Sequence, residues 1–505
     1  NVAAMALNLT SRLQVTAHYF WNRRNAAALS HHGVRLDYDP EQRRLASLIL
    51  GFALLVVAMA LAALLAYIKP AGQVGTSPIL ANRDTGAIYV MVDGRLHPTN
   101  LISARLISES AANPTFVKAK ELDKYPKGPK VGILGAPQEM PIRTGADSQW
   151  AVCDTAPAAT ARASAGKDPV TTALAGELTI GRRSEPLAMP NAILARHNDK
   201  TFVVWDGHRS DVDLGNKSVA LALGVDSSAP APVPMSTALY DAIPATDPLT
   251  IPAIAKAGEP APWDLGHRAV IGSVLSVRDL QESERFYVLL PNGVQHISPF
   301  VASLLRSDNS FGDVAPIEVS PDKLAVVPVV NSLPVSYYPP GRLHLVDTSV
   351  NATTCLAWSK GATDRAAKVT VLSGQGLPIP PSSDSRLVHL VKPGDDPASI
   401  VADQVYIAPG ATNLVMSTNA DPVSVSRDAL WWISDQGTRY GIELDDSALK
   451  PLGIATASAQ QAPWALIRVF GPGAALSQAA AKVEHGGDEN STGAAEALPT
   501  RAPDH

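Results

Sequence analysis

Residues 45–68 form an uncharged apolar run of 24 residues, LASLILGFALLVVAMALAALLAYI. As a helix, this run would extend roughly 36 Å, against roughly 30 Å for the hydrocarbon core of a bilayer. It contains no proline, and its one glycine is Gly51. The run therefore predicts a helix that spans a membrane, with a short segment before it and a long one after it.

Two other interpretations of the run fit less well. A secretory signal peptide has a shorter apolar core that ends in a small-residue cleavage site, whereas this run ends in Tyr67-Ile68-Lys69-Pro70. A buried core helix of this length in a soluble protein normally carries some polar residues, and here only Ser47 and Tyr67 are polar. A transmembrane helix over 45–68 remains the prediction.

The charges on the two sides of the run predict its orientation. Arginine occupies positions 12, 23, 24, 35, 43 and 44, and the acids before the run are Asp37, Asp39 and Glu41. After the run, Lys69 and Arg83 are the only bases before Arg95. Because cytoplasmic flanks carry the excess of arginine and lysine, we expect residues 1–44 in the cytoplasm and the large C-terminal part outside, with Arg43, Arg44 and Lys69 flanking the membrane.

The two cysteines of the chain, Cys153 and Cys355, both lie in the part predicted to be exported. In an oxidising compartment an isolated pair favours one structural disulfide; the alternative is two unrelated buried thiols. The formal net charge of −5 is small for 505 residues, so nucleic acid is not an expected partner. With 41 prolines and 35 glycines, the exported part should be rich in turns between short strands and helices.

The segment before the membrane predicts one helix. Capping residues at positions 8–11 precede Leu13, Ala17, Phe20 and Trp21, which recur at helical spacing among arginines. Such a helix lies on the anionic inner leaflet or docks on the cytoplasmic helices of a partner, and we favour the partner. His31-His32 have no further ligand nearby, and we interpret them as part of a solvated loop rather than a metal site.

The exported part contains a weak internal repeat. Aromatic and β-branched residues precede a turn that ends in glycine at Gly94, Gly207, Gly293 and Gly437. This pattern is typical of a strand that enters a tight hairpin. In three copies a helix start follows, after Thr99-Asn100, Asp213 and Ser298-Pro299, and then a second element at 114–122, 232–239 and 316–324. The spacing is uneven, so we expect four small modules around a non-repeated core rather than a solenoid.

The sequence offers little chemistry. It has no nucleophile-elbow, zinc-protease or paired-cysteine motif. The nearest match to a phosphate-binding loop is Gly215-Asn216-Lys217-Ser218, but Asn216 separates glycine from lysine, and Ser210 stands where the motif requires glycine. We interpret it as a helix N-terminus. The histidines at 208, 267, 296, 344 and 389 are scattered among polar turns, and we predict no metal site, no catalytic residue and no cofactor.

Several multi-residue blocks resemble the EccB family, a core component of mycobacterial type VII (ESX) secretion systems. They include Arg12-Leu-Gln-Val with the aromatics at 19–21, and the segments 86–90, 96–98, 103–106, 131–137, 150–154, 286–294, 354–358 and 439–441. The blocks occur in the family's order over nearly the whole chain, and the two cysteines fall at the positions of the family's pair. We identify the chain on these blocks as similar to that family.

The resemblance implies a single-pass inner-membrane protein with a cytoplasmic N-terminal segment. It implies an α+β fold with an elongated periplasmic body, in which a β-rich central domain linked by the Cys153–Cys355 disulfide carries four small α/β repeat modules. The implied partners are an FtsK/SpoIIIE-type ATPase component, the multi-spanning component D, component E and the mycosin protease. Some members of the family are called ATPases.

The sequence and the resemblance together give the following expected division of the chain. The expected parts are a cytoplasmic segment (1–44), the membrane helix (45–68), four repeat modules (69–150, 201–260, 286–335 and 429–482), parts of a central domain (151–200, 261–285 and 336–428) and a disordered tail (483–505). The predicted function is a scaffold that builds the periplasmic part of the export machine and self-associates through its modules.

Two alternative functions stay open at this point. The first is nucleotide hydrolysis, with Lys217 as the residue to test. The second is binding of cell-wall glycan, with Trp205, Trp431 and Trp432 stacking on sugars if they are exposed.

Overall fold

The computed structural model of the chain describes residues 11–30, 40–68, 74–145, 147–157, 168–226, 229–266, 268–278, 283–308, 315–391, 399–486 and 496–497. His31, His32, Lys69 and His267, which the sequence singled out, lie outside these residues. The chain divides into two compact units, Asn1–Gln73 and Val74–His505. The first unit is helical and the second is a mixture of strands and short helices, as predicted.

The first unit contains two helices, α1 (Arg12–Ser30) and α2 (Pro40–Ile68). Helix α1 begins with a reciprocal cap, because the Gln14 N–H donates to Ser11 Oγ at 3.4 Å and the Ser11 N–H donates to Gln14 Oε1 at 3.0 Å. The predicted helix in this segment is confirmed, and its Leu13, Phe20 and Trp21 are each more than half exposed.

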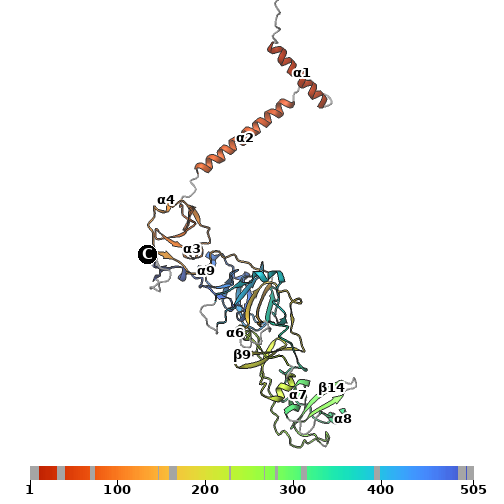
Figure 1. The fold of residues 1–505 in the computed structure, drawn as a ribbon. Coiled ribbons are helices and arrows are strands. Elements are labelled where there is room, and N and C mark those ends of the chain that lie inside the picture. The colour runs from red at the N-terminus through yellow and green to blue at the C-terminus, as the bar shows by residue number, and fades with distance from the viewer. Residues whose placement is uncertain are drawn as a thin grey trace, which may run out of the picture. The chain divides into compact units, whose positions relative to one another are not determined.

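Helix α2 contains the apolar run and is drawn as one continuous helix (Figure 1). Its stretch Leu45–Leu64 is long and apolar enough to cross a membrane, and none of its 20 residues is buried against other parts of the chain. It is the one helix of this kind among the residues that the structure describes. Exposure of so much apolar surface is unfavourable in water and is expected of a helix that faces lipid.

The second unit contains four sheets with the same order of strands. In each, three consecutive strands are antiparallel neighbours, and a fourth strand pairs parallel with the first of them. The strands, in sheet order, are β3 (Arg95–Thr99), β2 (Ile88–Val92), β1 (Ile79–Asn82) and β4 (Thr115–Val117); β11 (His208–Asp211), β10 (Lys200–Trp205), β9 (Asn191–His197) and β12 (Val233–Pro234); β15 (Gly293–Ile297), β14 (Glu284–Leu290), β13 (Val274–Arg278) and β16 (Ile317–Glu318); β24 (Thr438–Ile442), β23 (Leu430–Ile433), β22 (Leu414–Thr418) and β25 (Gln460–Pro463). Two further strands join these sheets: β17 (His344–Leu345) pairs with β9, and β26 (Gly471–Pro472) pairs with β24.

Helices occupy the same two places in each of these four parts. One lies between the third and fourth strands and another follows the fourth strand. They are α3 (Leu101–Ser108) and α4 (Ala119–Leu122), α5 (Lys217–Leu223) and α6 (Thr237–Ala242), α7 (Pro299–Asp308) and α8 (Pro321–Ala325), and α9 (Asp446–Leu452) and α10 (Trp464–Ile467), with the 3-10 turn η2 (Thr456–Ser458) before β25. Asn100 caps α3 as predicted, since its side chain accepts the Ser103 N–H.

After the second helix of each part, the chain runs parallel to the third strand of that part and pairs with it. Parallel bridges join Leu96 to Lys127, Arg209 to Ala245 and Val294 to Val329, and in the fourth part β26 takes the equivalent place beside β24. The same path of chain is therefore followed four times.

A seven-stranded sheet lies between these parts. In sheet order its strands are β20 (Val388–His389), β21 (Gln404–Ile407), β7 (Val170–Ala175), β6 (Asp147–Thr155), β18 (Thr353–Gly361), β19 (Lys368–Gly374) and β8 (Ser184–Pro186), and the 3-10 turn η1 (Pro381–Arg386) precedes β20. Its strands come from both halves of the unit, so the sheet forms only when segments that are distant in the sequence come together. We call it the central sheet.

Helices from different parts share hydrophobic cores. Ile102 and Leu106 of α3 pack in one cluster with Leu452 of α9, and these two helices lie side by side although they are far apart in sequence (Figure 1). Val219 of α5 packs in another cluster with Phe300 of α7. The first part thus packs on the fourth, and the second on the third.

The structure corrects three of the expected boundaries. Strands β9, β13 and β22 were assigned to the central domain, but each pairs with the strand that follows it in the chain and, within the described part of the chain, with no strand of the central sheet. The loops that join these strands to the next differ in length, so no repeated spacing marks them in the sequence. The helix N-terminus expected at 215–218 is confirmed, since α5 begins at Lys217 with Asn216 as its cap. Asp213 precedes the helix, and its side chain accepts the Gly215 N–H.

The expected disordered tail also differs from the structure where the structure describes it. Strand β27 (Val483–His485) pairs with β5 (Lys130–Val131) and with β28 (Glu496–Ala497), and the short helix α11 (Gln478–Ala481) precedes it. Residues 483–485 therefore lie beside β5, next to the first part of the unit.

Candidate functional site

Strand β6 is the place where the parts of the second unit meet. Side chains on a strand alternate between its two faces, and along β6 this alternation separates two environments. Trp150 and Val152 pack in a cluster with residues of α6 and α10, whereas Ala151 and Cys153 pack in a cluster on the other face of the central sheet. We define the β6 hub as Ser148, Trp150, Cys153 and Asp154.

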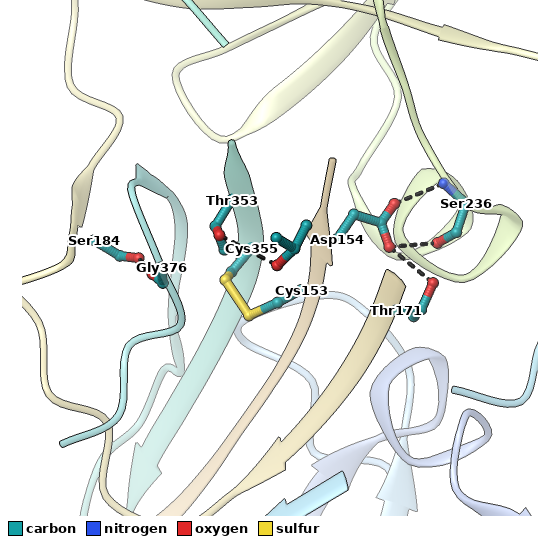
Figure 2. The surroundings of a disulfide bond; sticks show 9 residues. Cys153, Asp154, Thr171, Ser184, Ser236, Thr353, Cys355 and Gly376 are labelled. Carbon is teal, nitrogen blue, oxygen red and sulfur yellow. Dashed lines mark hydrogen bonds between the residues drawn. A yellow bond between two sulfur atoms is a disulfide. The ribbon is translucent and has the colours of Figure 1, made fainter. Parts of the chain in front are cut away.

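The disulfide joins β6 to its neighbour β18. Cys153 and Cys355 lie directly opposite each other in the antiparallel register, with their Cα atoms 4.0 Å apart and an S–S distance of 2.08 Å. Figure 2 shows the bond crossing between the two strands. Both residues are fully buried. The bond closes a loop with a sequence separation of 202 residues, which would stabilise the fold by about 5 kcal/mol in the chain-entropy account.

The carboxylate of Asp154 joins β6 to the second part. Its Oδ2 accepts the Ser236 N–H at 2.6 Å, and its Oδ1 accepts the hydroxyls of Ser236 at 2.8 Å and Thr171 at 2.9 Å (Figure 2). Ser236 is the N-cap of α6, so the carboxylate holds the start of that helix. Burial raises the pKa of Asp154 to about 6, and the Asp403 carboxylate adds to the rise, while the three hydrogen bonds lower it.

Ser148 and Trp150 join β6 to the fourth part. Trp150 Nε1 donates to Ser148 Oγ at 2.7 Å, and Ser148 Oγ donates to the Gln461 carbonyl of β25 at 2.7 Å. The Trp150 ring packs edge-on against Phe470 at 5.7 Å between centroids. Within the seven residues from Ser148 to Asp154, the β6 hub is therefore bonded to the central sheet, the second part and the fourth part.

An ion pair links the second and fourth parts beside the hub. Arg468 Nη2 lies 2.7 Å from Asp241 Oδ2, and Asp241 belongs to α6. The two side chains are 22% and 40% exposed, so the pair is worth at most about 1 kcal/mol. The ion pair therefore adds little to the free energy of unfolding, but it connects the second part to the fourth.

The arrangement of the hub is suited to holding elements together. The sulfur of Cys153 is buried in a disulfide, the hydroxyl of Ser148 donates to a carbonyl, and Asp154 is 4% exposed. Among the residues that the structure describes, no group of three or more His, Cys, Asp or Glu side chains could hold a metal. A cavity of about 460 Å³ lies elsewhere, in the fourth part, lined by Met416, Arg427, Leu444, Leu449, Thr456 and Ala457.

The four predicted turn glycines do not share one geometry. Asp93-Gly94 and Asp206-Gly207 each have positive φ at both positions, with 48° and 76° in the first turn and 43° and 79° in the second. This is the type I′ hairpin turn that the sequence predicted. Gly437 also has positive φ and ends a four-residue loop between β23 and β24.

Gly293 is required for a different reason. It is the first residue of β15, and a Cβ at this position would lie 2.2 Å from the Pro328 carbonyl oxygen of the returning segment. The sequence pattern could not distinguish this close approach from a turn, because both select glycine.

The other predicted residues are placed apart from the hub. Arg43 and Arg44 lie in the first turns of α2, and their side chains are outside the described part of the chain. Lys217 is the first residue of α5, after Asn216, whose side chain accepts the N–H groups of Ser218 and Val219. Of the five scattered histidines noted in the sequence, four are described, and they lie in different strands: His208 in β11, His296 in β15, His344 in β17 and His389 in β20.

The predicted glycan-stacking tryptophans are mostly core residues. Trp205 is 5% exposed and Trp432 is 2% exposed, so neither ring can stack on a sugar in this fold. Trp431 is half-buried against Trp464, with ring centroids 5.1 Å apart, and the Arg439 guanidinium lies 5.8 Å from its ring. The condition set for glycan stacking, exposure of the rings, is therefore not met by Trp205 and Trp432, which fill the cores of the second and fourth parts.

Sequence reasoning missed Asp154 as a functional side chain. A signal was present: Trp150, Val152 and Asp154 share one face of a strand, and an acid in a row of buried residues needs hydrogen-bond donors. The donors are Ser236 and Thr171, which belong to other elements. Nothing in the sequence around them identifies them as partners of Asp154.

Comparison with known families and proteins places this chain among secretion components. The family described as "Type VII secretion system ESX-1, transport TM domain B" matches residues 7–488. A Mycobacterium tuberculosis protein named "ESX-2 secretion system ATPase EccB2" is 47% identical over 478 residues, covering 94% of this chain and 95% of that protein. A Mycobacterium marinum protein named "ESX-5 secretion system ATPase EccB5" is 35% identical over 481 residues, covering 95% and 94%.

Two solved structures share the fold. A chain of an intact ESX-5 inner membrane complex matches with a TM-score of 0.73 and 34% identity, covering 98% of this chain and 99% of that one. An EccB3 dimer from an ESX-3 core complex matches with a TM-score of 0.69 and 34% identity, covering 80% and 99%. The resemblance found in the sequence is confirmed.

Proposed function

The chain belongs to the EccB family of type VII secretion components, and from this premise we propose that it is a structural scaffold subunit of an ESX complex in the inner membrane, where it builds the periplasmic part of the export machine. The observation that carries the proposal is the match of nearly the whole chain to a subunit of an intact inner membrane complex. The β6 hub supports it, because the hub binds the parts of one large body together.

We propose that α2 crosses the membrane, with the N-terminal segment in the cytoplasm and the second unit in the periplasm. The apolar stretch Leu45–Leu64 and the arginines before it support this orientation. A reporter enzyme that is active only outside the cytoplasm, fused after residue 505, should be active, and the same fusion before residue 12 should be inactive. The reverse result would overturn the orientation.

We propose further that the four sheets of equal strand order are repeat modules around the central sheet. The support is their common strand order, their helices at the same two places and the return of the chain along the third strand. The second, third and fourth modules would then begin one strand before the boundaries expected from the sequence, at β9, β13 and β22, and the first would begin with β1. Two modules pack on one another through α3 and α9, and two through α5 and α7.

The proposed partners are an FtsK/SpoIIIE-type ATPase component, the multi-spanning component D, component E, the mycosin protease and further copies of this chain. The support is that the solved relatives are a subunit of an inner membrane complex and a dimer. Affinity purification of the tagged full chain from its own membranes, followed by mass spectrometry, tests this set. The ATPase component and component D should co-purify in detergent, and purification of the chain without either would contradict the proposal.

The two alternatives receive less support from the residues. The word ATPase in the relatives' names applies to those proteins. In this chain the N–H groups at the start of α5 are occupied by the Asn216 side chain, and the helix has only seven residues. Glycan binding would have to use rings other than Trp205 and Trp432, because these are buried.

A further inference from the structure

A cluster of lysines follows the edge strand of the first module. Residues 118–130 read KAKELDKYPKGPK, with five lysines against the two acids Glu121 and Asp123. All five lysines are exposed. We define the basic edge as Lys118, Lys120, Lys124 and Lys127.

Two members of the basic edge carry charge that no neighbour neutralises. Lys124 Nζ lies 2.6 Å from Glu121 and Lys127 Nζ lies 3.1 Å from Asp123. Within the described part of the chain, Lys118 and Lys120 form no ion pair. Lys124 and Lys127 remain 60% and 57% exposed, so their paired ammonium groups still face solvent.

The segment that carries these lysines is firmly held. Leu122 is buried in the core of the first module, and Tyr125 packs against the same cluster. The Leu96 N–H donates to the Pro126 carbonyl at 2.8 Å, and the Gly128 N–H donates to the Leu96 carbonyl at 2.9 Å. At 100° per residue along α4, Lys120 lies on the side of the helix away from Leu122, and Lys124 follows the end of the helix with an exposed side chain. The cations are therefore displayed from a fixed backbone.

Only a short stretch of chain connects α2 to the module that carries the basic edge. Val74, the first described residue of the second unit, packs against the cluster that contains Leu122. Five residues, 69–73, separate Val74 from the end of α2 at Ile68. A fully extended chain advances at most about 3.6 Å per residue, so a connection of this length spans at most about 22 Å.

An exposed aromatic ring and a further cation adjoin the lysines. Phe116 of the edge strand β4 is 55% exposed. The Arg83 N–H donates to the Val117 carbonyl at 2.9 Å, which places the exposed Arg83 beside Lys118. Aromatic rings and basic side chains together are typical of surfaces that lie at a lipid headgroup layer.

From this placement we propose that the basic edge binds the phosphates of anionic lipid headgroups, so that the first module rests on the membrane surface. The proposal depends on the proposed crossing of the membrane by α2. Lysine ammonium groups are attracted to an anionic leaflet within about one Debye length of it. The contact would hold the first module at a fixed distance from the bilayer. Because α3 packs on α9, it would hold the fourth module at a fixed distance as well.

Lysine labelling of the full chain tests the proposal. The chain is reconstituted in nanodiscs of phosphatidylcholine alone or of phosphatidylcholine with an equal part of phosphatidylglycerol, and pulsed with an amine-acetylating reagent. Mass spectrometry then measures the labelling of each lysine. We expect several-fold slower labelling of Lys118 and Lys120 in the anionic discs only, with the difference removed by high salt.

Matched controls are available within the chain. Lys450 is paired with Asp446 in the way that Lys127 is paired with Asp123, and Lys368 is an exposed lysine of the central sheet. Both should label equally in the two kinds of disc. Inorganic phosphate added to the phosphatidylcholine discs should give no protection, which separates lipid from free phosphate.

Three results would overturn the proposal: equal labelling of Lys118 and Lys120 in both lipids, protection that phosphate alone reproduces, or protection that extends to Lys368 and Lys450. Failure of the chain to enter nanodiscs at all would instead contradict the proposed membrane-spanning helix, so the two proposals fail separately.

Discussion

At the scale of single residues, this chain uses buried polar groups to join elements. Asp154 is the clearest case, because one carboxylate accepts hydrogen bonds from β7 and from the cap of α6. A buried carboxylate of this kind is stabilising only as far as its donors offset the loss of water. Its protonation state should therefore affect the stability of the periplasmic unit.

Stability should depend on pH through Asp154. The folded-state pKa is raised to about 6 from a reference of 3.8, so the contribution of this group is fully present below about pH 4 and is lost as the pH rises through 6. The change amounts to about 3 kcal/mol. In Asp154→Asn the amide imitates the protonated acid, and the melting temperature of the variant should improve relative to wild type between pH 4 and 7. A difference in melting temperature between variant and wild type that stays constant from pH 4 to 7 would contradict the raised pKa of Asp154.

The two kinds of glycine should differ in their response to alanine. Gly94→Ala places a side chain in open space at a φ of 76°, which costs about 1–2 kcal/mol. Gly293→Ala adds a collision with the Pro328 carbonyl and should lower the melting temperature further. Thermal denaturation of the two variants side by side checks the order. Equal effects would mean that the close approach at Gly293 is absent.

Lys217 should be dispensable for any nucleotide turnover. Its helix start is capped by Asn216, and no phosphate loop precedes it. The Lys217→Ala variant of the full chain, purified beside wild type, should show the same rate of phosphate release from ATP. A large loss of a robust wild-type activity would support the nucleotide-hydrolysing alternative.

At the scale of elements, local signals were predicted well and distant pairings were not. The strands before Gly94 and Gly207, the capped start of α3 and the proline start of α7 were all visible in the sequence, because each depends on residues within a few positions. Strands β9, β13 and β22 were assigned to the wrong part, since their partners follow loops of different lengths. The β6 hub was visible only through Cys153, because Ser236, Thr171 and Gln461 are brought to it by the fold.

The β6–β18 pair should depend on its disulfide. Replacement of Cys153 and Cys355 by alanine removes a constraint worth up to about 5 kcal/mol and should lower the melting temperature. Because both sulfurs are buried, a mild reductant should leave folded wild type unchanged. It should destabilise wild type only when unfolding exposes the bond, and should not affect the double variant. A double variant as stable as wild type would show that the strand pairing alone suffices.

At the scale of the whole molecule, one large body is fastened at a few points and attached to one apolar helix. The central sheet takes strands from both halves of the unit, and its disulfide closes a separation of 202 residues. The four parts with equal strand order pack in pairs, through α3 with α9 and α5 with α7. Such a body holds its surfaces in fixed relation, which is what a scaffold requires of a subunit that meets several partners.

The copy number of the chain in its detergent-extracted complex tests the scaffold proposal most directly. Two differently tagged copies of the full chain are expressed together, one tag is used for purification, and the mass of the product is measured. The account predicts that the second tag co-purifies, in a particle far larger than 53.0 kDa that contains the FtsK/SpoIIIE-type ATPase component. A strictly monomeric chain, free of the second tag and of the ATPase component, would contradict it.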